Sequence, residues 1–329
     1  MHALTKFATA LTLCVGFAAC SSTMPGDDRG PDGTPNSPDQ QAESLSLAGS
    51  YTVKSKFQVT PEKLGTSGDF AIDLQDLADD PVEVLAEMIA DEVGLDFLAG
   101  SIEGWLKDAM DGRETKLTDA ISDFLTASLN FDLVSELVVD GSGSSVTMTH
   151  APTGMEVTID GKAYEYAFED LKADSLEQYS IAVSGSKGNN LTFKAHDVEV
   201  PYGKMLETVL DQVVVPAIDS GASDLGDALQ GIIDCNAVGQ SIYDDLQFGS
   251  ASVYASGCRA GADALAREML SKIGDNQSLT FAVTIDGKAT ASDSNNDGKA
   301  DSISGRWDSI FLSDLENKLP TPFKAKRTK

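Results

Sequence analysis

The stretch from Val146 to Phe168 decides the fold class, and it reads VTMTHAPTGMEVTIDGKAYEYAF. Apolar and polar residues alternate along most of it, which is the period of a β-strand with one buried face. Asp160-Gly161 interrupts the alternation with a dipeptide that is typical of tight hairpin turns. The stretch therefore predicts antiparallel strands joined by short turns.

Other segments with the same period extend this predicted sheet on both sides. They cover residues 51–59, 179–183, 191–195, 279–285 and 303–311. Near Ala195 the alternation slips by one residue, so that His196, Val198 and Val200 continue it in the other phase. Such a slip is typical of a β-bulge, and we expect one there.

Helical spacing marks two further regions, the first before residue 138 and the second over about 203–274. Asp80-Pro81 is typical of a helix start and Gly94 of a helix end. A later helix of the first region is expected to run from about Thr118 towards Val138. Together these patterns predict an α+β fold: one antiparallel sheet, flat or curled, packed with two helical regions.

One heptapeptide occurs twice, since VTIDGKA stands at 157–163 and again at 283–289. Each copy follows a helical region that itself follows a strand. The first interpretation is an internal duplication of a strand, helices and hairpin unit, with pseudo-repeats at 49–170 and 191–312. The second is that Asp-Gly turns flanked by β-forming residues recur because their physics is common.

The N-terminus has the pattern of an export signal. Lys6 precedes an apolar run, Phe7 to Phe17, which is too short to remain as a membrane-spanning helix. The run ends in Ala18-Ala19-Cys20, and small residues before a cysteine at this place resemble the lipobox of bacterial lipoproteins. The resemblance implies that residues 1–19 are removed and that lipid is attached to Cys20. The alternative is an ordinary signal peptide cut after the alanines.

The resemblance also implies a location. Two or three acyl chains on Cys20 would hold the protein stably on a membrane. Because no Asp follows Cys20, the implied destination is the outer membrane. We therefore expect a protein that is exported and lipid-anchored, facing the periplasm or the cell surface.

Composition suggests where the chain divides. Residues 20–48 are rich in Pro, Gly, Ser and Asp and have no apolar period before Leu45, so they are expected to form a disordered tether. A single globular domain is predicted over 49–319. The last ten residues, 320–329, contain the basic sequence KAKRTK and are predicted to form a frayed tail.

Charge excludes one class of partner. The chain has 52 acidic against 24 basic residues and a net charge of −28, so its surface should repel nucleic acids. Such acidity either keeps the protein soluble or attracts cations and basic partners.

Cysteine usage predicts one disulfide. Cys14 belongs to the signal and Cys20 to the lipid anchor, which leaves Cys235 and Cys258 in the exported body. In an oxidising compartment two such cysteines are expected to pair. Closing a loop of this length would stabilise the fold by roughly 3 kcal/mol.

A search for catalytic chemistry finds no motif. His150 and His196 are the histidines outside the signal, and both lie in predicted strands, where we expect surface or hydrogen-bonded roles. Asp197 and Glu199 would point away from His196, because neighbouring strand residues alternate in direction. The sequence also has no nucleophile elbow and no phosphate-binding loop. We assign no catalytic residue.

The one stretch with metal-ligand spacing is Asp293 to Asp301, DSNNDGKAD. Its candidate ligands are Asp293, Asn295, Asp297, the backbone oxygen of Lys299, and Asp301. It resembles the D-x-N-x-D-G loops of EF-hand and related calcium modules, except that Ser304 replaces the bidentate Glu at position 12. Two interpretations follow, a weak Ca²⁺ site or a polar hairpin turn.

Three functional hypotheses remain. The first is a non-catalytic structural or interaction module of the cell envelope, whose partner is an envelope protein. The second is a carrier of an apolar or amphipathic ligand, held between the sheet and the helices. The third and least favoured is a hydrolase that uses carboxylates.

Overall fold

The computed structural model describes residues 45–61, 66–110, 112–142, 145–171, 179–182, 189–274, 280–311 and 314–328. Residues 43–329 form one compact unit. Cys20, the signal segment and most of the tether lie outside the described residues.

The strands are β1 (Gly49–Gln58), β2 (Asn130–Ser142), β3 (Ser145–Ile159), β4 (Lys162–Ala167), β5 (Tyr179–Ala182), β6 (Asn190–Pro201), β7 (Thr280–Ser292), β8 (Ser302–Phe311) and β9 (Asp314–Arg327). They form one antiparallel sheet in the order β4-β3-β2-β1-β9-β8-β7-β6, with β5 also paired to β3. The fold is α+β, as the sequence predicted.

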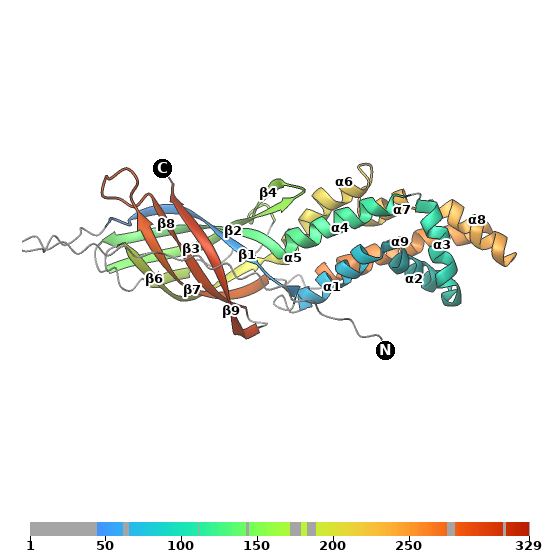
Figure 1. The fold of residues 1–329 in the computed structure, drawn as a ribbon, viewed down its shortest axis with the longest axis horizontal. Helices are drawn as coiled ribbons and strands as arrows, with labels where there is room; N and C mark the ends of the chain where they lie inside the picture. Colours follow the sequence, from blue (N-terminus) through green and yellow to red (C-terminus); the bar gives the residue numbers. More distant parts are fainter. Residues whose placement is uncertain are drawn as a thin grey trace, which may run out of the picture. The chain divides into compact units, whose positions relative to one another are not determined.

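The α-helices are α1 (Thr66–Asp79), α2 (Pro81–Val93), α3 (Ala99–Met110), α4 (Glu114–Leu129), α5 (Tyr202–Val209), α6 (Val215–Ile218), α7 (Leu225–Ile232), α8 (Cys235–Leu246) and α9 (Ala251–Gly274). A 3-10 turn (Asp96–Leu98) precedes α3, and a π-helical turn (Leu210–Val214) joins α5 to α6. Asp80 caps α2 by accepting from the Glu83 amide at 3.1 Å, and Gly94 ends it in a left-handed conformation, as predicted. The helices extend from one end of the strands (Figure 1).

Two halves of the unit share one connectivity. In each half a strand leads into a run of helices and then into further strands, which are β2 to β5 in the first half and β7 to β9 in the second. β1 pairs with β9 where the halves meet. The VTIDGKA copies occupy different places in the two halves. The first makes the turn between β3 and β4, whereas the second lies within β7. The two copies of the heptapeptide therefore do not occupy equivalent positions in the two halves.

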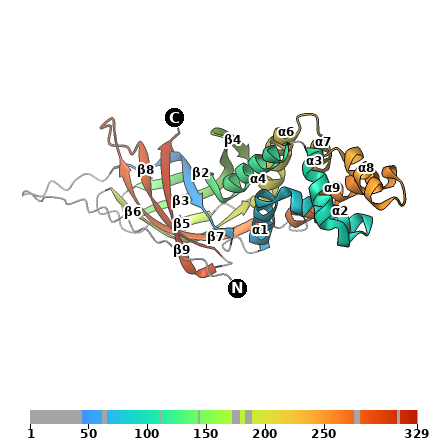
Figure 2. The same cartoon turned by 45° about the vertical axis from the view of Figure 1, so that its right-hand side comes forward.

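The sheet is curled. In its strand order, β2, β1, β9, β8 and β7 separate β3 from β6. Even so, a ring nitrogen of His150 on β3 lies 3.0 Å from one of His196 on β6. Bending of the whole sheet brings these two strands together, and the curvature is visible in Figure 2. The curl gives the sheet an inner face, which is buried, and an outer face.

The helices are held together by close contacts and a disulfide. A Cβ on Gly261 would meet backbone and side-chain atoms of Ile89 at 2.7–2.8 Å, so α9 and α2 touch almost backbone to backbone. The predicted disulfide is present: Cys235, at the start of α8, is joined to Cys258 within α9.

Two predictions about element boundaries are wrong. The helix expected from Thr118 towards Val138 ends at Leu129, and β2 follows at once. Residues 320–327, expected in a frayed tail, belong to β9 between β1 and β8. β2 pairs with β1, and β9 pairs with β1 and β8. In both places this pairing outweighed the local sequence pattern, which had favoured a helix in one case and a frayed end in the other.

The ordered unit also begins a little before the predicted boundary at residue 49. The Arg327 guanidinium donates to the carbonyls of Ala48 and Ala300, at 2.6 and 2.7 Å, and to the Tyr51 hydroxyl at 2.8 Å. The Tyr51 hydroxyl in turn donates to the Leu47 carbonyl at 2.8 Å. The end of the predicted tether is thereby fastened to the sheet.

Candidate functional site

Two β-bulges build the most polar part of the sheet's inner face. The register of β6 against β7 shifts between Phe193 and His196, which confirms the predicted bulge. A second shift, between β2 and β3 at Val134 and Ser135, was not predicted. The extra residues lie on β6 and β3, and there the bulges reverse which residues face inward, so that His196 and His150 point into the curl. Ser135 belongs to the unbroken alternation of β2, and the three side chains meet inside the curl.

These three side chains form one chain of hydrogen bonds. Ser135 Oγ lies 2.7 Å from His150 Nε2, and His150 Nδ1 lies 3.0 Å from His196 Nε2. His196 Nδ1 lies 3.1 Å from the Lys194 carbonyl, which is part of the β6 bulge.

The carbonyl at one end sets the proton positions along this chain. Because a carbonyl only accepts, His196 Nδ1 must donate, and in a neutral ring its Nε2 then accepts from His150 Nδ1. The remaining ring nitrogen, His150 Nε2, accepts a hydrogen bond from the Ser135 hydroxyl. The chain is satisfied with both rings neutral. Burial, followed by the nearby His196, lowers the pKa of His150 to about 3, and burial also lowers the pKa of His196.

Aromatic side chains fill the space around this network. Trp307 stacks on Phe323 with ring centroids 4.1 Å apart and lies 5.8 Å from the His150 ring. Its indole nitrogen donates to Ser55 Oγ at 3.0 Å. Phe193 packs on Trp307 with the centroids 4.9 Å apart. Trp307, Phe193 and His150 are all buried, and their rings contact one another inside the curl.

A serine that donates to a histidine has the geometry of a nucleophile and its general base. Here, however, Ser135 is only 1% exposed and its histidine is buried with it. A substrate could not reach the hydroxyl without opening the sheet. The arrangement is therefore suited to holding β2, β3 and β6 together. Sequence reasoning missed Ser135 and the pairing of the histidines, although the phase slip at Ala195 was a signal that His196 turns inward.

The loop with candidate metal ligands joins β7 to β8 as a polar hairpin loop. Its carboxylates accept from the loop itself: Asp301 from the amide and hydroxyl of Ser294 at 2.8 and 2.6 Å, and Asp293 from the Gly298 amide at 2.8 Å. These bonds to Ser294 lower the pKa of Asp301. Asn295 accepts from the Asp297 amide at 2.9 Å.

The same loop contacts the start of the ordered unit. Asp297 accepts from the Lys299 amide at 2.9 Å, and Gly298 adopts a left-handed conformation with φ of 80°. Ser46 donates to the Gly298 carbonyl and accepts from the Ala300 amide, both at 2.9 Å. Within the described ranges, no three His, Cys, Asp or Glu side chains converge so as to hold a metal ion. Ca²⁺ binding by this loop stays a prediction.

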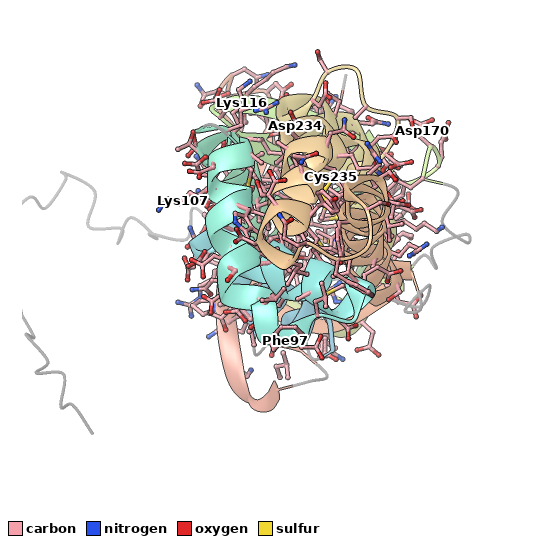
Figure 3. The ribbon with its side chains drawn as sticks, turned by 90° about the vertical axis from the view of Figure 1, so that its right-hand side faces the viewer. Phe97, Lys107, Lys116, Asp170, Asp234 and Cys235 are labelled. Atoms are coloured by element: carbon pink, nitrogen blue, oxygen red, sulfur yellow. A yellow bond between two sulfur atoms is a disulfide. The ribbon has the colours of Figure 1, made fainter. Side chains whose placement is uncertain are left out.

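A second feature of the surface is an apolar tip on the helices, formed by Phe97, Phe248 and Val253. They are 78%, 77% and 62% exposed. Phe97 follows α2, Phe248 lies between α8 and α9, and Val253 is in the first turn of α9. A Cβ on Gly257 would meet Val93, so the end of α2 lies beside the first turns of α9. The segments that carry the three side chains therefore adjoin the same end of these two helices. Phe97 is labelled in Figure 3.

No helix among the residues that the structure describes combines the length and apolar character needed to cross a membrane. Comparisons with protein-family models, with curated proteins and with solved structures found no match to this chain.

Proposed function

We propose that this protein is a non-catalytic interaction module of the cell envelope, anchored by lipid on Cys20, that binds a partner protein through its apolar tip. The lipobox-like segment supports the anchor and the export. The observation that carries the interaction is the exposure of two phenylalanines, from loops far apart in the sequence, at one end of the helices.

Exposed aromatic side chains support this proposal because they are enriched in protein interfaces and supply much of the binding energy there. The disulfide between α8 and α9 lies close to the tip in sequence and limits its freedom. Rigid presentation reduces the entropy lost on binding.

A partner protein suits the tip better than a lipid surface. Asp96 precedes Phe97, and Asp244 and Asp245 lie close before Phe248, all of them exposed. Anionic head groups would be repelled by these carboxylates, whereas a protein can place basic side chains against them.

The other two hypotheses receive less support. A carrier needs space for its ligand, but the described inner face is filled around Trp307 by packed side chains. Among the described residues, the nucleophile-like pair of Ser135 and His150 is buried, so it offers a hydrolase no accessible base.

The test is photo-crosslinking in cells from a reactive amino acid placed at Val253 in the first turn of α9. We expect a discrete protein adduct that disappears in Phe97→Asp plus Phe248→Asp. The control is Ile72→Asp, which replaces an exposed apolar residue of α1 that is 48% exposed and should leave the adduct unchanged. Absence of an adduct, or equal loss in the control, would show that the tip is not an interface.

A further inference from the structure

The outer face of the sheet is basic in a chain whose net charge is −28. Lys54 and Lys56 on β1 and Lys324 and Lys326 on β9 line one groove of about 780 Å³. These residues are exposed and alternate with buried neighbours, so all four side chains lie on the outer face. We call this feature the lysine groove. The predicted basic tail supplied two of its four lysines.

Strand register forces like charges together in the lysine groove. Lys54 is the direct cross-strand partner of Lys324, and Lys326 lies opposite Thr52, two residues from Lys54. Cβ atoms of direct partners are about 5 Å apart, and like charges at this distance destabilise a sheet. The like-charge pair opposes the pairing of β1 with β9, and the hydrogen bond with Glu156, which raises the pKa of Lys54, compensates this in part. Lys56 lies directly opposite Asp132 on β2.

Acidic side chains neutralise this cluster only in part. Lys54 pairs with Glu156 at 2.6 Å and reaches Glu165 at 3.7 Å. Asp132 lines the groove as well. No carboxylate in the described part of the chain lies within ion-pair distance of the ammonium groups of Lys56, Lys324 and Lys326.

A second like-charge pair continues the basic surface. Lys288 on β7 is the cross-strand partner of Arg306 on β8, and both line a neighbouring groove of about 430 Å³. The two grooves share Ser304 and Gly305, so they adjoin on β8. Asp308 Oδ1 lies 3.2 Å from Arg306 Nε and neutralises part of its charge.

We propose that the lysine groove binds a compact ligand that carries one or two phosphate-type anionic groups. Ammonium groups act as point charges for phosphate oxygens, and the hydroxyls of Thr52 and Ser304 can donate further hydrogen bonds. The groove crosses β1, β9 and β8, a width of about 10 Å, which accommodates two phosphoryl groups. A long polyanion such as nucleic acid would meet the acidic remainder of the surface and be repelled.

The groove has a size common among small-molecule sites. Pro322 and Phe323 contribute to its lining beside the aliphatic stems of the lysines. A lipid head group and a soluble phosphorylated compound offer the same chemistry to it, and the experiment distinguishes the two sources.

The experiment is isothermal titration of the full chain in nonionic detergent at low salt with three probes. These are inorganic pyrophosphate, dihexanoyl phosphatidic acid and dihexanoyl phosphatidylcholine. We expect the first two to bind and the third, which has no net charge, not to bind. In Lys324→Gln plus Lys326→Gln, loss of two charge-assisted contacts should weaken binding by about tenfold or more.

The matched control is Lys107→Gln plus Lys116→Gln, which removes the same charge from α3 and α4 (Figure 3). It should leave the dissociation constants unchanged within about twofold, since distant exposed charges are screened. Asp132→Asn removes the carboxylate of the groove and should strengthen binding. The melting temperature of Lys324→Gln plus Lys326→Gln should equal or exceed that of the unsubstituted protein, because the repulsion between residue 324 and Lys54 is relieved. This excludes misfolding as the cause of lost binding.

Tighter binding of phosphatidic acid than of pyrophosphate identifies a lipid head group, and equal binding identifies the phosphate alone. Equal weakening in the control variant, equal binding of phosphatidylcholine, or no binding of either anionic probe would overturn the proposal.

Discussion

At the scale of single residues, His150 shows how burial converts a titratable side chain into a structural one. Its two ring nitrogens are occupied by Ser135 and His196, and Trp307 lies against its ring. A proton added to Nε2 of this ring would make it a donor, so the Ser135 hydroxyl would have to turn and accept instead. It would also place a charge at a buried ring that no carboxylate of the described residues pairs with. Burial therefore keeps His150 neutral and links the protein's stability to pH.

The sign of this linkage follows from the two pKa values. In the folded protein the pKa of His150 is about 3, and in the unfolded chain it is about 6.5. Below pH 6.5 only the unfolded chain takes up the proton, so stability is fully present above pH 6.5 and falls as the pH drops towards 3. We expect the free energy of unfolding to lose about 1 kcal/mol per pH unit from this group between pH 6 and 4.

Urea unfolding of the unsubstituted protein and of His150→Gln across this range tests the linkage. The variant is less stable at pH 7, but its stability should depend less steeply on pH. Parallel curves for the two proteins would contradict a depressed pKa at His150.

At the scale of elements, close backbone contact sets the packing of α2 on α9. Gly261 faces Ile89 with no room for a Cβ. We expect Gly261→Ala to destabilise the fold by about 1–3 kcal/mol because it overpacks this contact. Gly104 lies within α3 with open space around it, and Gly104→Ala should stabilise by up to about 1 kcal/mol. Chemical denaturation of both variants measures the difference. Similar effects at the two positions would show that α9 does not approach α2 so closely.

The β7–β8 loop is the other element with a testable property. Asp293, Asp297 and Asp301 repel one another within nine residues, and a bound Ca²⁺ would relieve this. Without a bidentate Glu at position 12, we expect an affinity on the order of 10⁻⁴–10⁻³ M. Melting with excess Ca²⁺ should give a higher midpoint than melting with excess Mg²⁺ or chelator, and the gain should vanish in Asp293→Ala plus Asp297→Ala. Equal shifts with both ions would indicate screening of the net charge.

At the scale of the whole molecule, the anchor determines where these surfaces act. We expect Cys20→Ser to abolish acyl labelling and to release the protein from membranes, because lipid on this residue is the proposed attachment. Fractionation of cells grown with a radiolabelled fatty acid measures both properties. A variant that remains with the membrane fraction would require another attachment.

The sequence alone determined those features whose cause is local. Alternation predicted the sheet and the bulge near Ala195, Asp80 and Gly94 predicted the ends of α2, and the cysteine count predicted the disulfide. Each of these features depends on a few neighbouring residues or on the number of cysteines. It can therefore be predicted without knowing which distant segments pack against it. The candidate metal loop was likewise placed as a turn between two strands.

Only the tertiary structure decided which strands pair and what the curled sheet brings together. Phe131 and Leu133 fit both a helical and a strand pattern, and pairing of β2 with β1 selected the strand. Lys324 and Lys326 looked like a tail because their long-range partners, Lys54 and Ser302, are remote in sequence. His150 and His196 meet only because the curl closes the distance between β3 and β6. The hydrogen bonds and side-chain contacts that stabilise a strand come from segments far away in the sequence. The local pattern of apolar residues does not identify those segments.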